Sequence, residues 1–151
     1  MRSWLAVAVL PVALAAATFL LAPSRSDAAA QVVDITGGYS GRFLFKVQPM
    51  TGVEAASRGP DPATVTVSQT GANVAFNISL DTPAGPKNYN IGGSYGRNLF
   101  FATGSSPDGD MVLTGKATGQ APKIVLKGSV VLVASTGITT FTFTLKQVPP
   151  G

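Results

Sequence analysis

Apolar and polar residues alternate with a period of two along most of the chain from Tyr39 onward. In the clearest segment, residues 139–146, Phe141, Phe143 and Leu145 share one side of an extended chain, and threonines and a lysine occupy the other. Such alternation is typical of a β-strand with one buried and one solvated face. Weaker versions recur and predict eight strands, over residues 39–47, 63–70, 73–80, 87–95, 98–103, 111–118, 123–134 and 138–147.

Most connections between these segments are short and contain residues that tolerate positive φ, as in Gly71-Ala72-Asn73. Residues 50–62 form the one long connection, and a single helical turn is conceivable at 53–57. Eight strands joined mostly by hairpins predict an all-β, antiparallel up-and-down meander. Closure into a barrel would remove both exposed edges. A two-sheet sandwich is the alternative, because the sequence does not show whether the last strand pairs with the first.

Residues 1–30 have the pattern of a secretory signal peptide. Arg2 precedes an apolar run at 4–22, and Ala28-Ala29-Ala30 offers a small-residue cleavage site. An uncleaved membrane anchor is the rival interpretation, since the run is just long enough to span a bilayer. With cleavage near Ala30, we expect an exported protein, periplasmic or extracellular, that contacts a membrane only through its signal peptide. Residues 31–151 would then form a single all-β domain.

Composition argues against several classes of function. The chain has no Cys and no His, so Ser-His-Asp and Cys-His catalysis and a typical zinc site are ruled out. Glu54 is the only Glu, and Asp108 and Asp110 fit a polar turn better than a calcium loop. We therefore predict no enzyme activity, no metal and no cofactor. Residues 31–151 carry nine Lys or Arg and six Asp or Glu, scattered along the sequence, which does not favour nucleic-acid binding.

Two Arg–Tyr neighbourhoods are the best candidates for a binding site. Tyr39 and Arg42 lie in a stretch at 37–45 that matches residues 92–100, containing Tyr95 and Arg97, at six of nine positions. If this match is an internal repeat, the two sites could flank one mouth of a barrel, where Arg can bind a carboxylate or stack on a ring. The simpler interpretation is a coincidence of two Gly-rich turns with solvated arginines.

The segment 35–43, Ile-Thr-Gly-Gly-Tyr-Ser-Gly-Arg-Phe, resembles the first strand of the calycins, the lipocalin and avidin group. There a Gly-x-Trp element opens an eight-stranded barrel that binds a small ligand. The resemblance implies a calycin-like exported barrel. This chain departs from the pattern because its only Trp is Trp4, within the predicted signal peptide. No binding residue is therefore carried over.

The leading hypothesis is an exported, non-enzymatic β-barrel domain that binds a small apolar ligand or another macromolecule, such as a protein partner. Phenylalanines on the inward faces would either fill the barrel or line a pocket. A structural or assembly subunit of the cell surface is the first alternative, because an open edge strand can add to another sheet. A small outer-membrane barrel, with its apolar faces turned to lipid, is the second.

Overall fold

The computed structural model describes residues 32–49 and 56–150, without the side chains of Pro49 and of residues 56–58. All eight predicted strands are confirmed. Their bounds are β1 Gly37–Pro49, β2 Ala56–Thr70, β3 Asn73–Thr82, β4 Gly85–Gly96, β5 Leu99–Ser106, β6 Gly109–Thr118, β7 Val125–Ala134 and β8 Gly137–Gln147. The predicted signal peptide and its cleavage site lie outside the described residues. Within the described part of the chain, no helix is long and apolar enough to cross a membrane.

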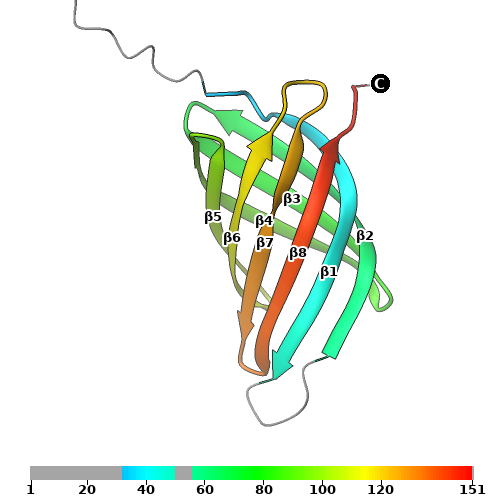
Figure 1. Cartoon of the computed structure of the whole chain (residues 1–151). Helices are drawn as coiled ribbons and strands as arrows, with labels where there is room; N and C mark the ends of the chain where they lie inside the picture. Colours follow the sequence, from blue (N-terminus) through cyan, green and yellow to red (C-terminus); the bar gives the residue numbers. More distant parts are fainter. Residues whose placement is uncertain (1–31, 50–55, 151) are drawn as a thin grey trace, which may run out of the picture.

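The strands form a closed antiparallel barrel in which each pairs with its neighbours in sequence (Figure 1). Closure is made by β1 and β8, which pair over eleven positions, with Phe43 opposite Phe143. The fold is therefore a barrel and not a sandwich. Closure pairs the first and last strands, which would be the two open edges of an unclosed meander.

β2 begins earlier than the sequence predicts, so part of the expected long connection is strand. Ala56 already pairs with Val47, and Pro62 pairs with Arg42. Pro60 and Pro62 favoured a loop in this stretch. Here β2 is paired with β1, whereas its pairing with β3 starts only at Ala63. Below that point the β2–β3 ladder is absent, so on this side of β2 a residue without an N–H is tolerated. Of the helical turn suggested at 53–57, the last two residues lie in β2 and the rest are outside the described residues.

The apolar faces point inward and fill the middle of the barrel. The rings of Phe43 and Phe143 stack at 5.0 Å, and Phe100 lies 6.4 Å from Phe143. Space for these rings comes from glycine: a Cβ on Gly128 would lie 2.9 Å from Cζ of Phe143, closer than real Cβ contacts allow. The aromatic rings therefore pack against one another instead of lining a channel.

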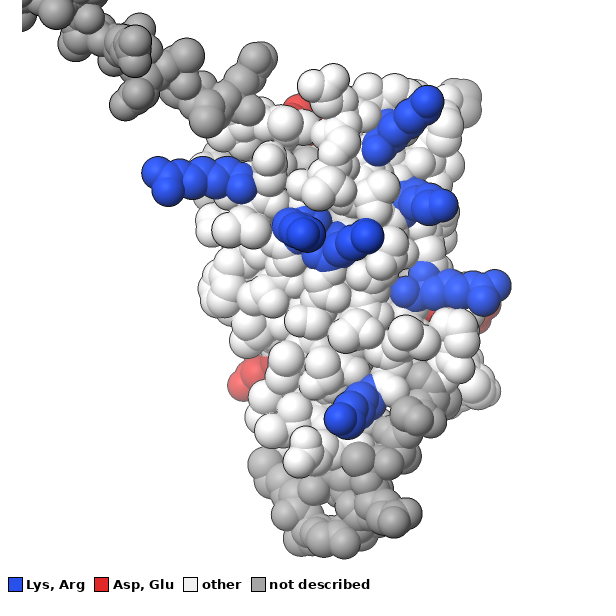
Figure 2. Space-filling model, viewed as in Figure 1, with Lys and Arg blue, Asp and Glu red and all other residues white. Residues whose placement is uncertain are grey.

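The outward faces of the strands are mainly polar. Asn77 and Asn90, for example, lie opposite each other on β3 and β4 and are both exposed. This orientation is the reverse of the outer-membrane alternative, which needs apolar side chains on the outside. Figure 2 shows that the face seen in Figure 1 carries many more Lys and Arg than Asp and Glu.

The two ends of the barrel differ. At the end where β1 starts, here called the upper end, Ile35 is fully buried, and its N–H donates to Oε1 of Gln69 at 2.9 Å. The side chain of Gln147 donates to the carbonyl of Thr36, which ties the segment before β1 to β8. The opposite, lower end holds the β3–β4, β5–β6 and β7–β8 turns (Figure 1).

Candidate functional site: a cup at the lower end of the barrel

A cavity of about 520 Å³ opens at the lower end of the barrel. We call it the cup. Apolar side chains line most of the cup, together with hydroxyl and charged groups. The apolar part includes Phe45, Val47, Leu80, Ala84, Leu132, Ala134 and Phe141, and the polar part Thr82, Lys87, Tyr89, Asp108, Thr136 and Thr139. A cavity of this size with a few convergent polar groups is typical of small-molecule sites.

The floor of the cup is closed by packed side chains. The rings of Phe45 and Phe141 meet edge to face at 4.5 Å. Beneath them lies a void of only about 10 Å³, lined by Phe43, Ile78 and Met111 among others. This volume is about the minimum for a single water molecule. A ligand can therefore enter the cup but not continue along the barrel axis.

One side of the cup lies where the backbone ladder between β4 and β5 ends. The two strands pair only from Gly92–Thr103 up to Gly96–Leu99, so the lower half of β4 is not held by this ladder. The β2–β3 ladder ends at Ala63–Leu80. Residues 81–86, at the tip of the β3–β4 hairpin, therefore lack a ladder partner on both sides, whereas residues 87–91 of β4 pair with β3 but not with β5. This half-hairpin, residues 80–91, is called the flap.

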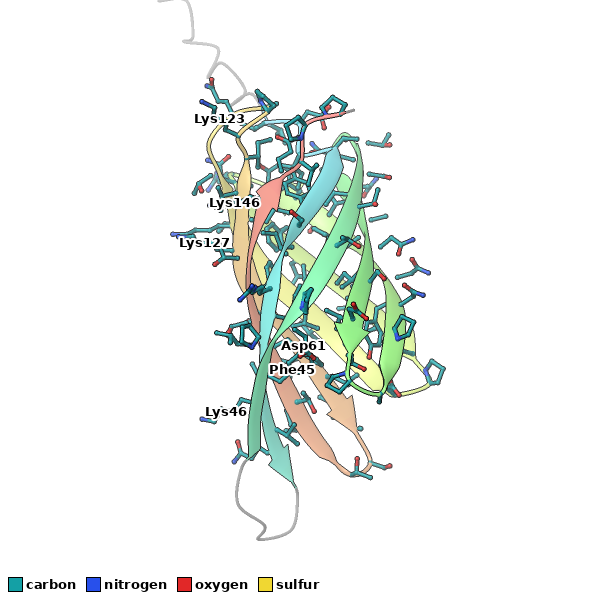
Figure 3. All side chains as sticks on the ribbon, turned by 90° about the vertical axis from the view of Figure 1, so that its right-hand side faces the viewer. Phe45, Lys46, Asp61, Lys123, Lys127 and Lys146 are labelled. Carbon is teal, nitrogen blue, oxygen red and sulfur yellow. The ribbon has the colours of Figure 1, made fainter. Side chains whose placement is uncertain are left out.

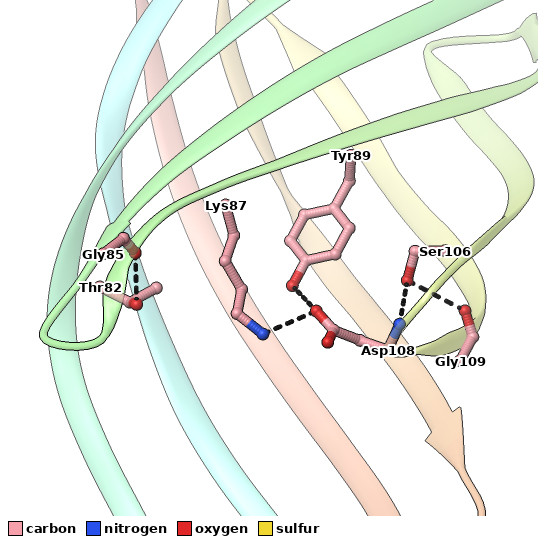
Figure 4. A network of polar contacts seen from close by, with 7 residues as sticks. All are labelled: Thr82, Gly85, Lys87, Tyr89, Ser106, Asp108 and Gly109. Carbon is pink, nitrogen blue, oxygen red and sulfur yellow. Dashed lines mark hydrogen bonds and ion pairs between the residues drawn. The ribbon is translucent and has the colours of Figure 1, made fainter.

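Side chains bridge the flap to the β5–β6 turn. Asp108, in that turn, accepts hydrogen bonds at Oδ2 from Nζ of Lys87 at 2.7 Å and from the hydroxyl of Tyr89 at 2.9 Å (Figure 4). Both donors are on β4 and point toward the carboxylate. We call these three residues the latch. The latch connects β4 to the β5–β6 turn by side-chain bonds, below the point where the backbone pairing of β4 with β5 ends.

The latch is braced on both sides. In the β5–β6 turn, the backbone N–H of Asp108 donates to Oγ of Ser106 at 3.1 Å, and that hydroxyl donates to the carbonyl of Gly109. In the flap, the hydroxyl of Thr82 donates to the carbonyl of Gly85 at 2.6 Å. These local bonds fix the two turns that the latch connects.

In the latch, the pKa values of Asp108 and Tyr89 both move away from neutral pH. The hydrogen bond from Lys87, followed by the one from Tyr89, lowers the pKa of the Asp108 carboxyl. Burial raises the pKa of the Tyr89 phenol, and the hydrogen bond to Asp108 raises it further. At neutral pH Asp108 is therefore a carboxylate and Tyr89 a neutral phenol.

The two predicted site tyrosines lie inside the barrel at the upper end, away from the cup. The hydroxyl of Tyr39 donates to the carbonyl of Ile35 at 2.7 Å. Burial raises the pKa of Tyr39, and the nearby Tyr95 adds to that rise. Burial also raises the pKa of Tyr95. Both rings are part of the packing that seals this end.

The two predicted site arginines lie on the outer surface. Arg42 points outward from the middle of β1, whereas Arg97 is in the β4–β5 turn with a φ of 50°. The matching stretches thus occupy different places: residues 37–45 all lie in β1, while residues 92–100 span the end of β4, a turn and the start of β5. The sequence match is not a structural repeat, and no described cavity brings the two arginines together.

The latch residues were not among the predicted site residues, although Lys87 carries a signal. It shares the alternation of Tyr89 and Ile91, whose side chains face inward, and a charged group at an inward position requires a partner. The partner of Lys87, Asp108, is 21 residues away in sequence, and only the fold brings the two side chains together.

A larger hollow, of about 1020 Å³, lies on the outer surface over β5, β6 and β7. It opens widely to solvent, so much of this volume is bulk water rather than an enclosed site. Among the described residues, no group of three or more acidic, His or Cys side chains comes together to hold a metal ion.

No protein-family model and no curated protein matches this chain. Among solved structures, it is similar to the siderocalin Ex-FABP, which is described as functioning through dual ligand specificities. The similarity covers 77% of this chain and 75% of that chain, with 7% sequence identity and a TM-score of 0.44. The closed eight-stranded barrel agrees with the barrel that the calycin resemblance implied, and a likeness this distant carries over neither a family nor a residue role.

Proposed function

We propose that this protein is an exported, non-enzymatic β-barrel that binds a small, mainly apolar ligand in the cup. The observation that carries the proposal is the cup itself: a cavity of about 520 Å³ lined by apolar side chains together with hydroxyl and charged groups. Pockets of roughly 300–1,000 Å³ with this composition bind small ligands by burying their apolar surface.

The closed floor limits the shape of the ligand. Because the rings of Phe45 and Phe141 block the axis, the ligand sits across the mouth of the barrel and keeps one side near solvent. The apolar part of the ligand should be compact, because it would lie on Leu80, Leu132 and the two phenylalanine rings. A polar group on such a ligand would lie near the latch, where Lys87 is 43% exposed and retains hydrogen-bonding capacity toward the cup.

The acidity of the latch supports a binding role over catalysis. A general acid or base works best when its pKa lies near the operating pH. The pKa of Asp108 is lowered and that of Tyr89 is raised, so both move away from neutrality. A fixed hydrogen-bonding group at the rim, rather than a proton-transfer group, is the role that fits these shifts.

The test is fluorescence titration of phenylnaphthylamine, a neutral apolar dye, into the chain from Gln31 onward. Every strand and every buried core residue lies within this fragment, so it keeps the described fold. Thr139→Trp places a large ring in the cup, and we expect it to weaken dye binding at least roughly tenfold by occupying the apolar space. Thr140→Trp, on the outward face of the same strand, is the matched control and should bind like the wild type.

Saturable binding that only Thr139→Trp weakens would support the cup as the site. Failure of the wild type to bind this dye and a panel of similar neutral dyes would overturn the proposal. An equal effect of the two Trp variants would also contradict it, because the dye would then occupy the surface.

A further inference from the structure

The barrel register gathers cations that are scattered in the sequence. Lys116 of β6 lies directly opposite Lys127 of β7, and Lys127 lies opposite Thr144 of β8, which in turn lies opposite Arg42 of β1. Lys146 follows two residues after Thr144 and points to the same outer side. We call Lys116, Lys127 and Lys146 the cationic face; Arg42 is excluded because, one strand further on, it lies half-way round the eight-stranded barrel from β5. Figure 3 shows Lys127 and Lys146 projecting from one side of the barrel, with Lys123 above them.

Acidic residues do not neutralise this face. Among the described residues, the ion pair found is Lys87–Asp108, at the lower end of the barrel. Asp110 is the second residue of β6 at that lower end, and Asp81 is the next-to-last residue of β3. Asp34, in the segment before β1, accepts a hydrogen bond from the N–H of Thr36. Like charges placed directly opposite each other, as Lys116 and Lys127 are, destabilise a sheet. The Lys116–Lys127 pair therefore lowers the stability of the isolated protein, and an anionic partner would relieve the repulsion between the two side chains.

Exposed apolar side chains border the cationic face. Leu99 and Phe101 on β5 are 60% and 52% exposed, and Leu99 lies directly opposite Lys116. Together with Arg97 and Lys127 they line the open hollow on the outer surface. A polyanion in solution would satisfy the cations but would leave these two apolar side chains in water.

We propose that the outer surface formed by the cationic face, Leu99 and Phe101 docks the barrel on an anionic lipid bilayer. Leucine and phenylalanine beside lysines is the composition that binds at membrane interfaces, where apolar groups enter the headgroup boundary and ammonium groups meet phosphates. Lysine is depleted in protein–protein interfaces, whereas all three residues of the cationic face are lysines. The charge and the apolar groups together thus favour a bilayer over an acidic protein.

This contact is additional to the signal peptide, the one membrane contact that the sequence pattern predicted. It is also independent of the cup, which lies at the lower end and shares no residue with this surface. Failure of dye binding in the cup and failure of membrane docking are therefore separate outcomes.

The experiment measures co-sedimentation of the chain from Gln31 onward with vesicles. One set contains phosphatidylcholine alone, and the other equal parts of phosphatidylcholine and phosphatidylglycerol. We expect binding to the anionic vesicles only, with loss at ~1 M salt, where charges are screened beyond about 3 Å. Lys116→Gln/Lys127→Gln should weaken binding about 30-fold, from roughly fivefold for each basic side chain.

A matched control removes the same net charge elsewhere. Asn77→Asp/Asn90→Asp changes two exposed, directly paired residues on β3 and β4, at the back of the barrel in Figure 1, and should bind like the wild type. Phe101→Ser should weaken vesicle binding by roughly tenfold through lost apolar contact. The same variant should not change binding to soluble polyglutamate.

Equal binding to neutral and anionic vesicles, or none to either, would overturn the proposal. So would an equal loss in the Lys116→Gln/Lys127→Gln variant and the Asn→Asp control, because net charge and not a defined surface would then govern binding. If polyglutamate binds as tightly as the vesicles and Phe101→Ser leaves vesicle binding unchanged, the surface recognises an acidic polymer and the bilayer is the wrong partner.

Discussion

Removing the Asp108 carboxylate should loosen the flap without unfolding the barrel. In Asp108→Ala the ion pair with Lys87 is lost, and its two side chains are 43% and 38% exposed. An exposed pair of this kind contributes about 0.2–1 kcal/mol after solvent screening. The hydrogen bond from the largely buried Tyr89 to a charged acceptor is worth more, about 1.5–3 kcal/mol, but water in the cup can partly replace it.

The combined loss in Asp108→Ala is therefore about 1–2 kcal/mol in the free energy of unfolding, measured by urea denaturation at pH 7. Asp110→Ala is the matched control. It also removes a carboxylate that accepts a hydrogen bond, from Oγ of Ser105 at 2.7 Å, but in an exposed position on the outside. This control should change the free energy of unfolding by less than about 0.5 kcal/mol.

The pH dependence gives a second measure of the latch. Because the pKa of Asp108 is lowered in the fold, its contribution is fully present above the ordinary value of 3.8 and is lost as the pH falls through the folded-state pKa. The stability difference between the wild type and Asp108→Ala should thus stay constant from pH 5 to pH 7 and shrink below about pH 3.8. Equal stability of the wild type and Asp108→Ala at pH 7, or an equal loss in Asp110→Ala, would refute the latch.

Three further predictions concern the core and one turn. Phe143→Ala removes a ring stacked on Phe43 and should lower the free energy of unfolding by about 3–5 kcal/mol in urea denaturation. Gly128→Ala adds a methyl group that would press on Cζ of Phe143 and on the carbonyl of Thr114, and a loss of about 1–3 kcal/mol is expected from the same measurement. Arg97→Asn relieves a φ of 50° in the β4–β5 turn and should raise the thermal midpoint, by an amount that corresponds to about 0.5–1 kcal/mol; an unchanged or lower midpoint would contradict it.

The strands were predictable because their signal is local. The alternation around Phe141 and Phe143 depends only on neighbouring residues, and the structure places both rings inside the barrel. The start of β2 was missed for a related reason. Pro60 and Pro62 indicate a break in a strand that is paired on both sides, but here the β2–β3 ladder is absent.

The candidate site was harder to predict because its parts meet only in the closed barrel. Asp108 was interpreted as part of a polar turn, which is where it lies, but its role depends on Lys87 and Tyr89 from another strand. The same holds for the cationic face. Lys116 and Lys127 are eleven positions apart in sequence and become direct neighbours through the β6–β7 register. Charge that is scattered along a chain is therefore no guide to charge on the surface of a barrel.

The different construction of the two ends determines where a ligand can enter. At the upper end, Ile35 and the hydrogen bond of Tyr39 to its carbonyl seal the barrel over a buried core. At the lower end, the β4–β5 ladder stops at Gly92–Thr103, and among the described contacts the latch alone ties the flap to the β5–β6 turn. Local opening needs few broken bonds where ladders are absent. Entry to the cup should therefore involve outward movement of the flap, and dye should bind and leave faster in Asp108→Ala than in the wild type.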